Sequence, residues 1–194
     1  MSATSSTPIP SGAARPIDPG TRIGHVHLKV ADLDRALAFY TGVLGFGLTQ
    51  RYGRQAAFVS AGSYHHHIGL NTWESLGGPS PSAGATGLYH LAVLYPTRAA
   101  LADALQRLSD ARIPLDGASD HGVSQALYLR DPDGNGVELY WDRPEAEWPR
   151  GPGGDLRMVT QPLDLGDLLA AGETEQAVAH AARDPAPPET GHAG

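Results

Sequence analysis

The sequence predicts an α+β fold in which two tandem βαβββ units form an open, curved barrel around a metal site. One order of elements, strand, helix, strand and strand, occurs twice along the chain. Each copy opens on a strand-like run with a histidine at its start, and the two histidines, His25 and His90, are 90 − 25 = 65 residues apart. Neither unit can bury an apolar face alone, so we expect the two sheets to pair around a shared cavity.

Changes of composition along the chain set the expected boundaries. Segments rich in Ser, Pro, Ala and Gly offer too little apolar surface to offset the entropy of ordering. We therefore expect a disordered leader at 1–20, a first unit at 21–76, a linker at 77–87, a second unit at 88–145, and a C-terminal extension at 146–194 that is mostly irregular with a short helix near 163–171.

The first unit begins with a predicted strand at Ile23–Val30. Asp32 is a favourable N-cap, and the apolar residues after it recur at helical spacing until Gly45, which is typical of a helix end. Two further strands are predicted at Gln55–Ser60 and Tyr64–Trp73. The helical stripe consists of Leu33, Leu37, Tyr40 and Leu44.

The second unit repeats this order. Leu88–Tyr95 is strand-like, and Pro96-Thr97 caps a helix with an apolar stripe. The remaining strands are predicted at Ser124–Leu129 and Gly136–Trp141, because a turn sequence, Asp-Pro-Asp-Gly, lies between them. The stripe of this helix consists of Leu101, Leu105 and Leu108.

Charge and composition exclude several classes of partner. The chain has 14 Lys and Arg against 21 Asp and Glu, a net charge of −7, and no basic cluster, so neither nucleic acid nor an anionic membrane is an expected partner. No apolar stretch resembles a signal peptide or approaches membrane-spanning length. We expect a cytoplasmic homo-oligomer that binds a small molecule. Because the chain has no cysteine, a bound metal must rely on His, Asp and Glu.

Three residues form the candidate metal site: His25, His90 and Glu138. Glu138 interrupts an otherwise apolar strand, where a buried carboxylate needs a cation or a strong donor. A single histidine at the start of a strand is more often a hydrogen-bonded structural residue, so the repeat carries the prediction. Two imidazoles and one carboxylate are the set that holds non-heme Fe(II) on one face and leaves positions open.

These motifs resemble the vicinal oxygen chelate superfamily over about residues 22–145. The resemblance rests on the His-x-x-Leu-x-Val opening at 25–30, on Asp-Leu-x-x-Ala-x-x-Phe-Tyr at 32–40, and on Leu-Gly-Phe at 44–46. Within the superfamily the chain is similar to the type I extradiol catechol 2,3-dioxygenases. Their signature is a histidine, an apolar residue with Tyr, then Asp-Pro-x-Gly and Glu, and it runs here from His121 through Tyr128 to Glu138.

The resemblance implies roles for individual residues. It makes His25, His90 and Glu138 the ligands of Fe(II), or of Mn(II), and it makes His121 and Tyr128 hydrogen-bonding groups around substrate and oxygen. It also implies an acid/base histidine on the last strand of the first unit. The candidates are His65, His66 and His67. Either His66 alone, or His65 with His67, faces the cavity if the strand alternates, and the spacing of the family segment favours His66. We expect no catalytic role for the other three histidines: His27 is interpreted as a structural residue, and His180 and His192 as solvated tail residues.

The implied activity is cleavage of a catechol-like aromatic diol with O₂ next to its two hydroxyl groups. Two alternatives remain open, because one scaffold can host several chemistries. The first is a binding protein that sequesters an aromatic metabolite. Such proteins typically lack the full set of two histidines and one glutamate, which this chain has. The second is a glyoxalase-type isomerase or lyase, which usually has a second carboxylate where the first unit here offers histidines.

Overall fold

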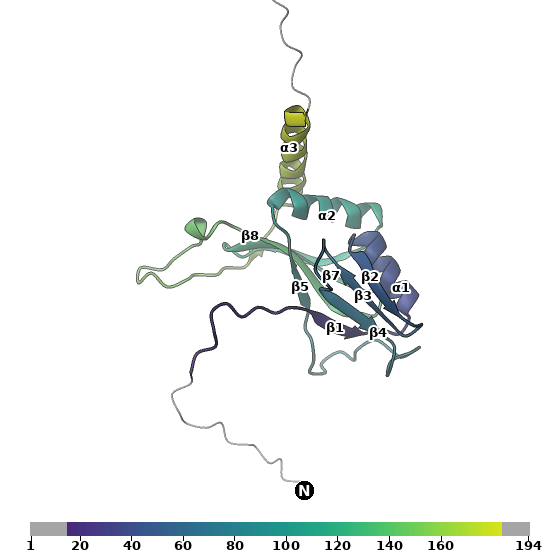
Figure 1. The fold of residues 1–194 in the computed structure, drawn as a ribbon. Helices are drawn as coiled ribbons and strands as arrows, with labels where there is room; N and C mark the ends of the chain where they lie inside the picture. Colours follow the sequence, from purple (N-terminus) through teal and green to yellow (C-terminus); the bar gives the residue numbers. More distant parts are fainter. Residues whose placement is uncertain (1–14, 184–194) are drawn as a thin grey trace, which may run out of the picture.

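Two separate mixed sheets carry the two units (Figure 1). The structure is a computed structural model that describes the backbone of residues 15–183 and the side chains of residues 15–174. The strand orders are β1-β4-β3-β2 and β5-β8-β7-β6-β9, and within the described residues no strand pair joins the sheets. The expected α+β class is confirmed, and the sheets are not closed into a barrel. The strands are β1 (Val26–Lys29), β2 (Gly47–Tyr52), β3 (Ala56–Ser60), β4 (Ile68–Asn71), β5 (Leu91–Leu94), β6 (Leu115–Asp120), β7 (Ser124–Arg130), β8 (Gly136–Asp142) and β9 (Gln161–Pro162).

The helices lie where the two predicted apolar stripes occur, with one addition near the C-terminus. Asp32 caps the first helix, since its side chain accepts hydrogen bonds from the N–H groups of Asp34 and Arg35, both at 3.0 Å. Thr97 caps the second in the same way. Both stripes are buried, as predicted. The helices are α1 (Leu33–Leu37), which continues as the π-helix η1 (Ala38–Val43), α2 (Arg98–Asp110), the 3₁₀ turn η2 (Glu145–Glu147) and α3 (Leu165–Arg183).

Two strands were missing from the residue-by-residue prediction. β2 and β6 complete the βαβββ order of each unit, so the unit was expected although these strands were not located. The reason is visible in their burial. All six residues of β2 are exposed, and β6 is at most half-buried. Neither strand therefore shows the alternation of apolar and polar residues that marks a half-buried strand in a sequence.

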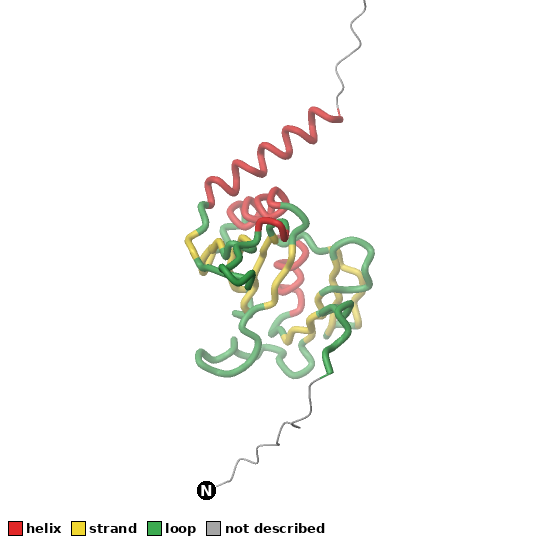
Figure 2. Tube along the Cα trace, turned by 90° about the vertical axis from the view of Figure 1, so that its left-hand side faces the viewer, coloured by secondary structure: helices red, strands yellow, loops and turns green. Residues whose placement is uncertain are grey.

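The C-terminal helix is longer than the short helix expected near 163–171. From Gly172 onward the extension was expected to be irregular. In the structure α3 continues through Gly172, which packs closely on α2: a Cβ at this position would lie 2.7 Å from Cβ of Ala102. Leu168 is fully buried on the same contact. Figure 2 shows α3 leading away from the sheets beyond α2. The rest of the expected tail, 184–194, and residues 1–14 of the expected leader lie outside the described residues.

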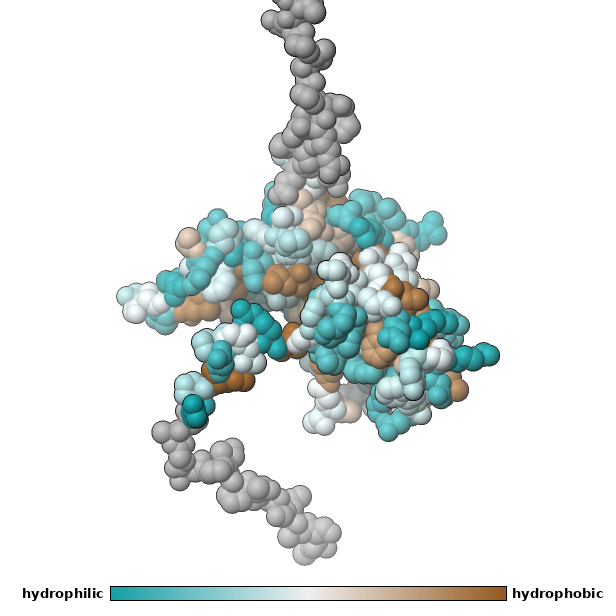
Figure 3. All heavy atoms as spheres, in the orientation of Figure 1, coloured by the Kyte–Doolittle hydropathy of each residue, from teal (hydrophilic) through white to brown (hydrophobic). Residues whose placement is uncertain are grey.

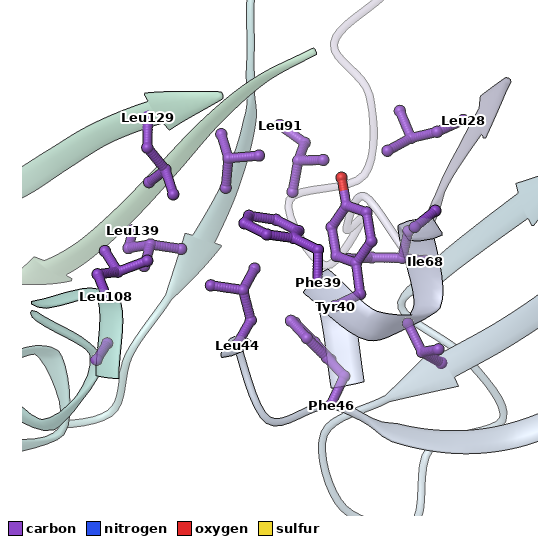
Figure 4. Packing of buried hydrophobic residues seen from close by; sticks show 14 of the residues in the cluster. Leu28, Phe39, Tyr40, Leu44, Phe46, Ile68, Leu91, Leu108, Leu129 and Leu139 are labelled. Carbon is purple, nitrogen blue, oxygen red and sulfur yellow. The ribbon is translucent and has the colours of Figure 1, made fainter. Parts of the chain in front are cut away.

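One apolar core runs through both units. Phe39 and Tyr40 of η1 lie between the first sheet and the apolar side chains of the second unit, among them Leu91 and Leu129 (Figure 4). Burying side chains of this size stabilises a fold by roughly 1.5–3 kcal/mol each. The two units are therefore packed together around one shared core.

A buried carboxylate links the units. Asp131, in the turn between β7 and β8, accepts a hydrogen bond at 3.0 Å from the Tyr40 hydroxyl of the first unit. It also accepts bonds from the N–H groups of Asp133 and Asn135. Next to it, Asp133 accepts from the N–H of Ala31 at 2.9 Å. The Asp-Pro-Asp-Gly turn therefore joins the second unit to the carboxyl end of β1.

Replacing Asp131 with asparagine should destabilise the fold. Its Oδ2 accepts from Tyr40 and from the Asn135 amide, and an amide nitrogen in that place would face two donors. We expect a loss of about 2 kcal/mol, seen as a fall in melting temperature of about 4–8 °C. The control is Asp116→Asn, which breaks an exposed ion pair with Arg130 and should cost less than about 1 kcal/mol. Equal melting temperatures for the two variants would contradict the structural role of Asp131.

Within the described part of the chain, none of the helices is both long enough and apolar enough to span a membrane.

Candidate active site

Each sheet has one face turned away from its helix, and the candidate residues lie on these two open faces. On β1, Leu28 is buried toward α1, whereas its neighbours His27 and Lys29 are exposed on the other side. On the second sheet, Ala92 and Leu94 of β5 lie in register with Glu138 and Tyr140 of β8. Side chains alternate across a strand, so these four residues share one face.

A connected group of polar side chains occupies the open face of the second sheet. His90 Nε2 lies 2.9 Å from Glu138 Oε2, and the Tyr128 hydroxyl lies 3.1 Å from Glu138 Oε1. His121 Nε2 lies 2.7 Å from the same hydroxyl. Register explains the contact between Tyr128 and Glu138, because these residues are paired across β7 and β8. The structure thus brings together four of the residues predicted from the sequence, and we call them the second-sheet cluster.

The C-terminal segment positions His121 by a contact that the sequence did not indicate. His121 Nδ1 lies 2.9 Å from the carbonyl oxygen of Val159, and the N–H of Val159 donates to the carbonyl of His121 at 3.0 Å. A carbonyl can only accept, so Nδ1 carries the proton and Nε2 is left as an acceptor toward Tyr128. No sequence signal was available, because both bonds use the backbone of Val159.

The second-sheet cluster has more acceptors than protons. The Tyr128 hydroxyl carries one proton but faces two acceptors, His121 Nε2 and Glu138 Oε1. Burial, followed by the charge of Glu138, raises the pKa of Tyr128 to about 12, so it remains a phenol at neutral pH. A cation or a proton at Glu138 would satisfy the carboxylate and release Tyr128 for another contact. The donor set therefore suits a cation beside Glu138.

A cavity of about 380 Å³ adjoins this cluster. Such a volume is within the range of small-molecule sites. Gly136 is needed at its edge, because a Cβ there would collide with the carbonyl oxygen of Tyr89 and lie 3.0 Å from Cβ of His90. A larger cavity, of about 650 Å³, lies at the start of α1 and contains neither group of histidines. The lining of the smaller cavity, of about 380 Å³, includes His90, Ser119, His121, Tyr128 and Arg130.

The other predicted residues gather on the first sheet, and we call them the first-sheet cluster. The rings of His25 and His66 have centroids 4.5 Å apart, and His66 lies 4.9 Å from the ring of Phe58. His67 is turned to the Ser60 hydroxyl, with Nδ1 at 2.9 Å from it. Burial, and then His25, lower the pKa of His66 below its ordinary value.

The alternation expected for the three consecutive histidines does not hold. The predicted strand Tyr64–Trp73 begins only at Ile68, so residues 64–67 are outside β4 and their side chains need not alternate. His65 and His66 lie with their Nδ1 atoms 2.8 Å apart. His27 contacts the rings of Phe58 and Trp73 and fits the space left by Gly69. The expected His180 and His192 lie outside the residues whose side chains are described.

The metal trio is only partly assembled in one chain. His90 and Glu138 are side by side, but His25 lies in the first-sheet cluster beside His66. Throughout the part of the chain that the structure describes, no three His, Cys, Asp or Glu side chains are grouped so as to hold a metal ion. The single chain therefore offers two of the three predicted donors together.

Comparisons with known proteins agree with the fold and the motifs. Residues 22–139 match the family described as the Glyoxalase/Bleomycin resistance protein/Dioxygenase superfamily. A catechol-2,3-dioxygenase of Bacillus subtilis is 41% identical over 160 residues, which cover 80% of this chain and 54% of that protein. Biphenyl-2,3-diol 1,2-dioxygenase 3 of Rhodococcus globerulus is 34% identical over 122 residues, which cover 62% of this chain and 63% of that protein. The chain thus spans less than two thirds of the length of these curated relatives.

A solved structure shows the same fold. The crystal structure of a lactoylglutathione lyase from Agrobacterium tumefaciens matches 64% of this chain and 96% of its own chain, with 27% identity and a TM-score of 0.50. These three relatives are thus enzymes of two kinds, two dioxygenases and one lyase.

Proposed function

The chain belongs to the Glyoxalase/Bleomycin resistance protein/Dioxygenase superfamily, and from this premise we propose that it is an extradiol ring-cleaving dioxygenase. Its substrates would be a catechol-like aromatic diol and O₂. The observation that carries the proposal is the continuous contact from His121 through Tyr128 and Glu138 to His90. The similarity to a catechol-2,3-dioxygenase, at 41% identity, supports the same choice.

We propose divalent iron as the cofactor, with manganese as the alternative. His90 and Glu138 would provide two ligands, and His25 the third. Two imidazoles with one carboxylate suit Fe(II) and leave coordination positions open. The bound metal would supply electron transfer between the diol and dioxygen.

The residues of the chain itself would orient the diol and move its protons. Tyr128, held as a phenol, can donate to an anionic oxygen of the substrate once Glu138 is satisfied elsewhere. His121 is fixed in one tautomer by Val159, so its Nε2 presents a defined acceptor at the edge of the cavity. His66, whose ring lies 4.5 Å from that of His25, is our candidate for the group that takes a proton from a diol hydroxyl and later returns it.

A glyoxalase-type lyase is the second candidate, because the solved structure of a lactoylglutathione lyase matches this chain in fold and is 27% identical to it in sequence. Its weakness is the ligand set. The first-sheet cluster offers His25 and His66 rather than a carboxylate.

The test of the proposed function is metal analysis followed by a substrate assay. Protein purified without oxygen should bind about one iron per chain. With a catechol it should consume about one O₂ per molecule of yellow ring-opened product, the stoichiometry of a dioxygenase. Catechol binding without oxygen uptake by the metal-loaded protein would favour a sequestering protein instead. Formation of lactoylglutathione would favour the lyase.

A further inference from the structure

We propose that Asp120, together with Arg143, is a positioning residue of the candidate active site. The two residues hold the C-terminal segment, residues 143–162, against the turn that carries His121, and so keep His121 Nε2 turned to Tyr128 as an acceptor. The inference rests on the proposed function, because His121 is one of the groups that would contact the substrate. The C-terminal segment lies beyond the family match, which ends at residue 139, so no role for it follows from the family.

The C-terminal segment has little apolar burial to hold it in place. None of residues 143–162 is buried, and Leu156 and Met158 are 45% and 64% exposed. Figure 1 shows the segment as a loop that leaves β8 and returns toward the sheet, and in Figure 3 hydrophilic and apolar atoms are mixed over this part of the surface. A stretch with few buried apolar contacts opens easily unless other contacts fix it. Its position therefore depends on hydrogen bonds and ion pairs with the rest of the chain.

Asp120, the last residue of β6, contacts the segment at both of its ends. Its Oδ2 accepts from Arg143 at 2.5 Å, where the segment begins, and its backbone pairs with Gln161 of β9, where the segment ends. The side chains of Asp120 and Arg143 are 24% and 27% exposed, and a partly buried ion pair is screened less than an exposed one. The other oxygen of the carboxylate, Oδ1, accepts from the N–H of Gly122 at 2.8 Å. One carboxylate thus joins the segment to the turn between β6 and β7.

The turn that carries His121 lies in close contact with the segment. Gly122 has a φ of +76°, a left-handed conformation that favours glycine. A Cβ there would lie 2.9 Å from Cγ of Pro149 and 3.3 Å from Cγ2 of Val159. This contact brings two acceptors of the segment to His121 Nδ1, the carbonyl of Val159 at 2.9 Å and the hydroxyl of Thr160 at 3.3 Å. The tautomer of His121 therefore depends on where the segment lies.

A buried glutamine fixes the carboxylate of Asp120 from the other side. Gln125 is 4% exposed, its Nε2 donates to Asp120 Oδ2 at 3.2 Å, and its Oε1 accepts from Nε of Arg98 at 2.8 Å. An amide has one donor end and one acceptor end, so these two partners leave Gln125 a single orientation. Burial acts to raise the pKa of Asp120, but the hydrogen bonds from Gly122, Gln125 and Arg143 outweigh it and hold the pKa below its ordinary value. The group is therefore a carboxylate at neutral pH.

Loss of Asp120 should release the segment and with it the tautomer of His121. Without the segment, His121 Nδ1 loses both of its partners, and Nε2 can carry the proton instead. A protonated Nε2 donates to the Tyr128 hydroxyl and no longer offers an acceptor at the edge of the cavity. A lower melting temperature alone would not change the tautomer of the folded protein, so the tautomer distinguishes a positioning residue from a merely structural one.

The ¹⁵N signals of the imidazole report the tautomer directly. The full chain is labelled with ¹⁵N-histidine, freed of paramagnetic metal with a chelator and studied at pH about 8, above the ordinary pKa of histidine. The His121→Gln variant identifies the signals of His121. We expect a protonated Nδ1 in the wild type, and in Asp120→Ala a shift of both ring signals toward the Nε2–H form. Arg143→Ala should give the same shift, and the double variant no further shift, because the two residues act as one pair.

The matched control is Asp103→Ala, which also removes an aspartate that is paired with an arginine. Asp103 lies 2.7 Å from Arg107 on α2, within one helix, and this pair has no contact with the turn. The control should leave the tautomer and turnover unchanged. Circular dichroism on each variant confirms the fold, and Arg143→Ala alone decides the question if Asp120→Ala does not fold.

Turnover is the second measurement. Asp120→Ala should bind as much metal as the wild type, because Asp120 is not one of the proposed ligands. We expect its kcat for ring cleavage to fall roughly 10- to 10²-fold, the scale for a catalytic group that is displaced by about 1 Å. Oxygen uptake by the metal-loaded variants measures this loss.

The outcomes separate this inference from the proposed function. An unchanged tautomer in both variants, or a protonated Nε2 in the wild type, would overturn the inference while the dioxygenase proposal stands. A changed tautomer with wild-type turnover would overturn it as well, because the position of His121 would then not matter for the reaction. If the wild type consumes no oxygen with any catechol, the proposed function falls. A changed tautomer in that protein would still support the hold of Asp120 on His121.

Discussion

Replacing Glu138 with alanine should remove bound metal and abolish ring cleavage. Glu138 is the single carboxylate of the proposed ligand set, and its side chain is only 13% exposed. Loss of an outer partner of a ligand already costs roughly 10–100-fold in metal affinity, and loss of a ligand itself should cost more. Metal analysis after anaerobic purification, together with oxygen uptake, measures both effects.

A glutamine at position 138 separates a metal ligand from a structural residue. Glutamine keeps the volume and an oxygen that can accept from Tyr128, so the melting temperature should stay within about 2–4 °C of wild type. It lacks the charge that a cation requires, so metal should still be lost. Glu147→Ala, at an exposed position of η2, is the matched control and should leave metal and turnover unchanged. Full metal content in Glu138→Gln would remove Glu138 from the ligand set.

The fold was predictable wherever burial left a period in the sequence. Buried apolar residues recur at regular spacing in the two helical stripes and in the strand around Glu138. The caps Asp32 and Thr97 were predictable for another reason, because these residue types favour the start of a helix. β2 could not be located, because every one of its residues is exposed. The continuation of α3 beyond 171 was not foreseen for a different reason: the close packing of Gly172 on Ala102 joins residues that are far apart in sequence.

The candidate site was predictable as a set of residues but not as an arrangement. Matched positions in two repeats identified His25 and His90, and an acidic residue in an apolar strand identified Glu138. The repeat does not specify how two units pack, so the separation of His25 from the other two was not foreseen. The contact between Val159 and His121 was also hidden, because backbone groups carry no sequence signal.

Removing His66 should slow turnover while the metal stays bound, because we propose His66 as an acid/base group and not as a ligand. Loss of a general acid or base typically costs 10²- to 10⁴-fold in rate, and we expect roughly this loss for His66→Ala. Tyr128→Phe should cost less, about 1.5–3 kcal/mol for one hydrogen bond to an anion, or roughly one to two powers of ten. Stopped-flow oxygen consumption by the metal-loaded variants measures both rate losses and shows which is larger. Catechol binding by the same variants is the reference.

The neighbours of His66 supply the controls for this order. His65 and His67 differ in their contacts, since His67 is turned to Ser60 and His65 is exposed beside His66. Alanine at either position should therefore leave turnover within about tenfold of wild type, well short of the loss of an acid/base group. If His66→Ala turned over normally and one of its neighbours did not, the proton transfer would belong to that neighbour. If all three variants were normal, the first-sheet histidines would have no part in the chemistry beyond His25. Of the three consecutive histidines, His66 is the best placed beside His25, because His65 is exposed and His67 is turned to the Ser60 hydroxyl.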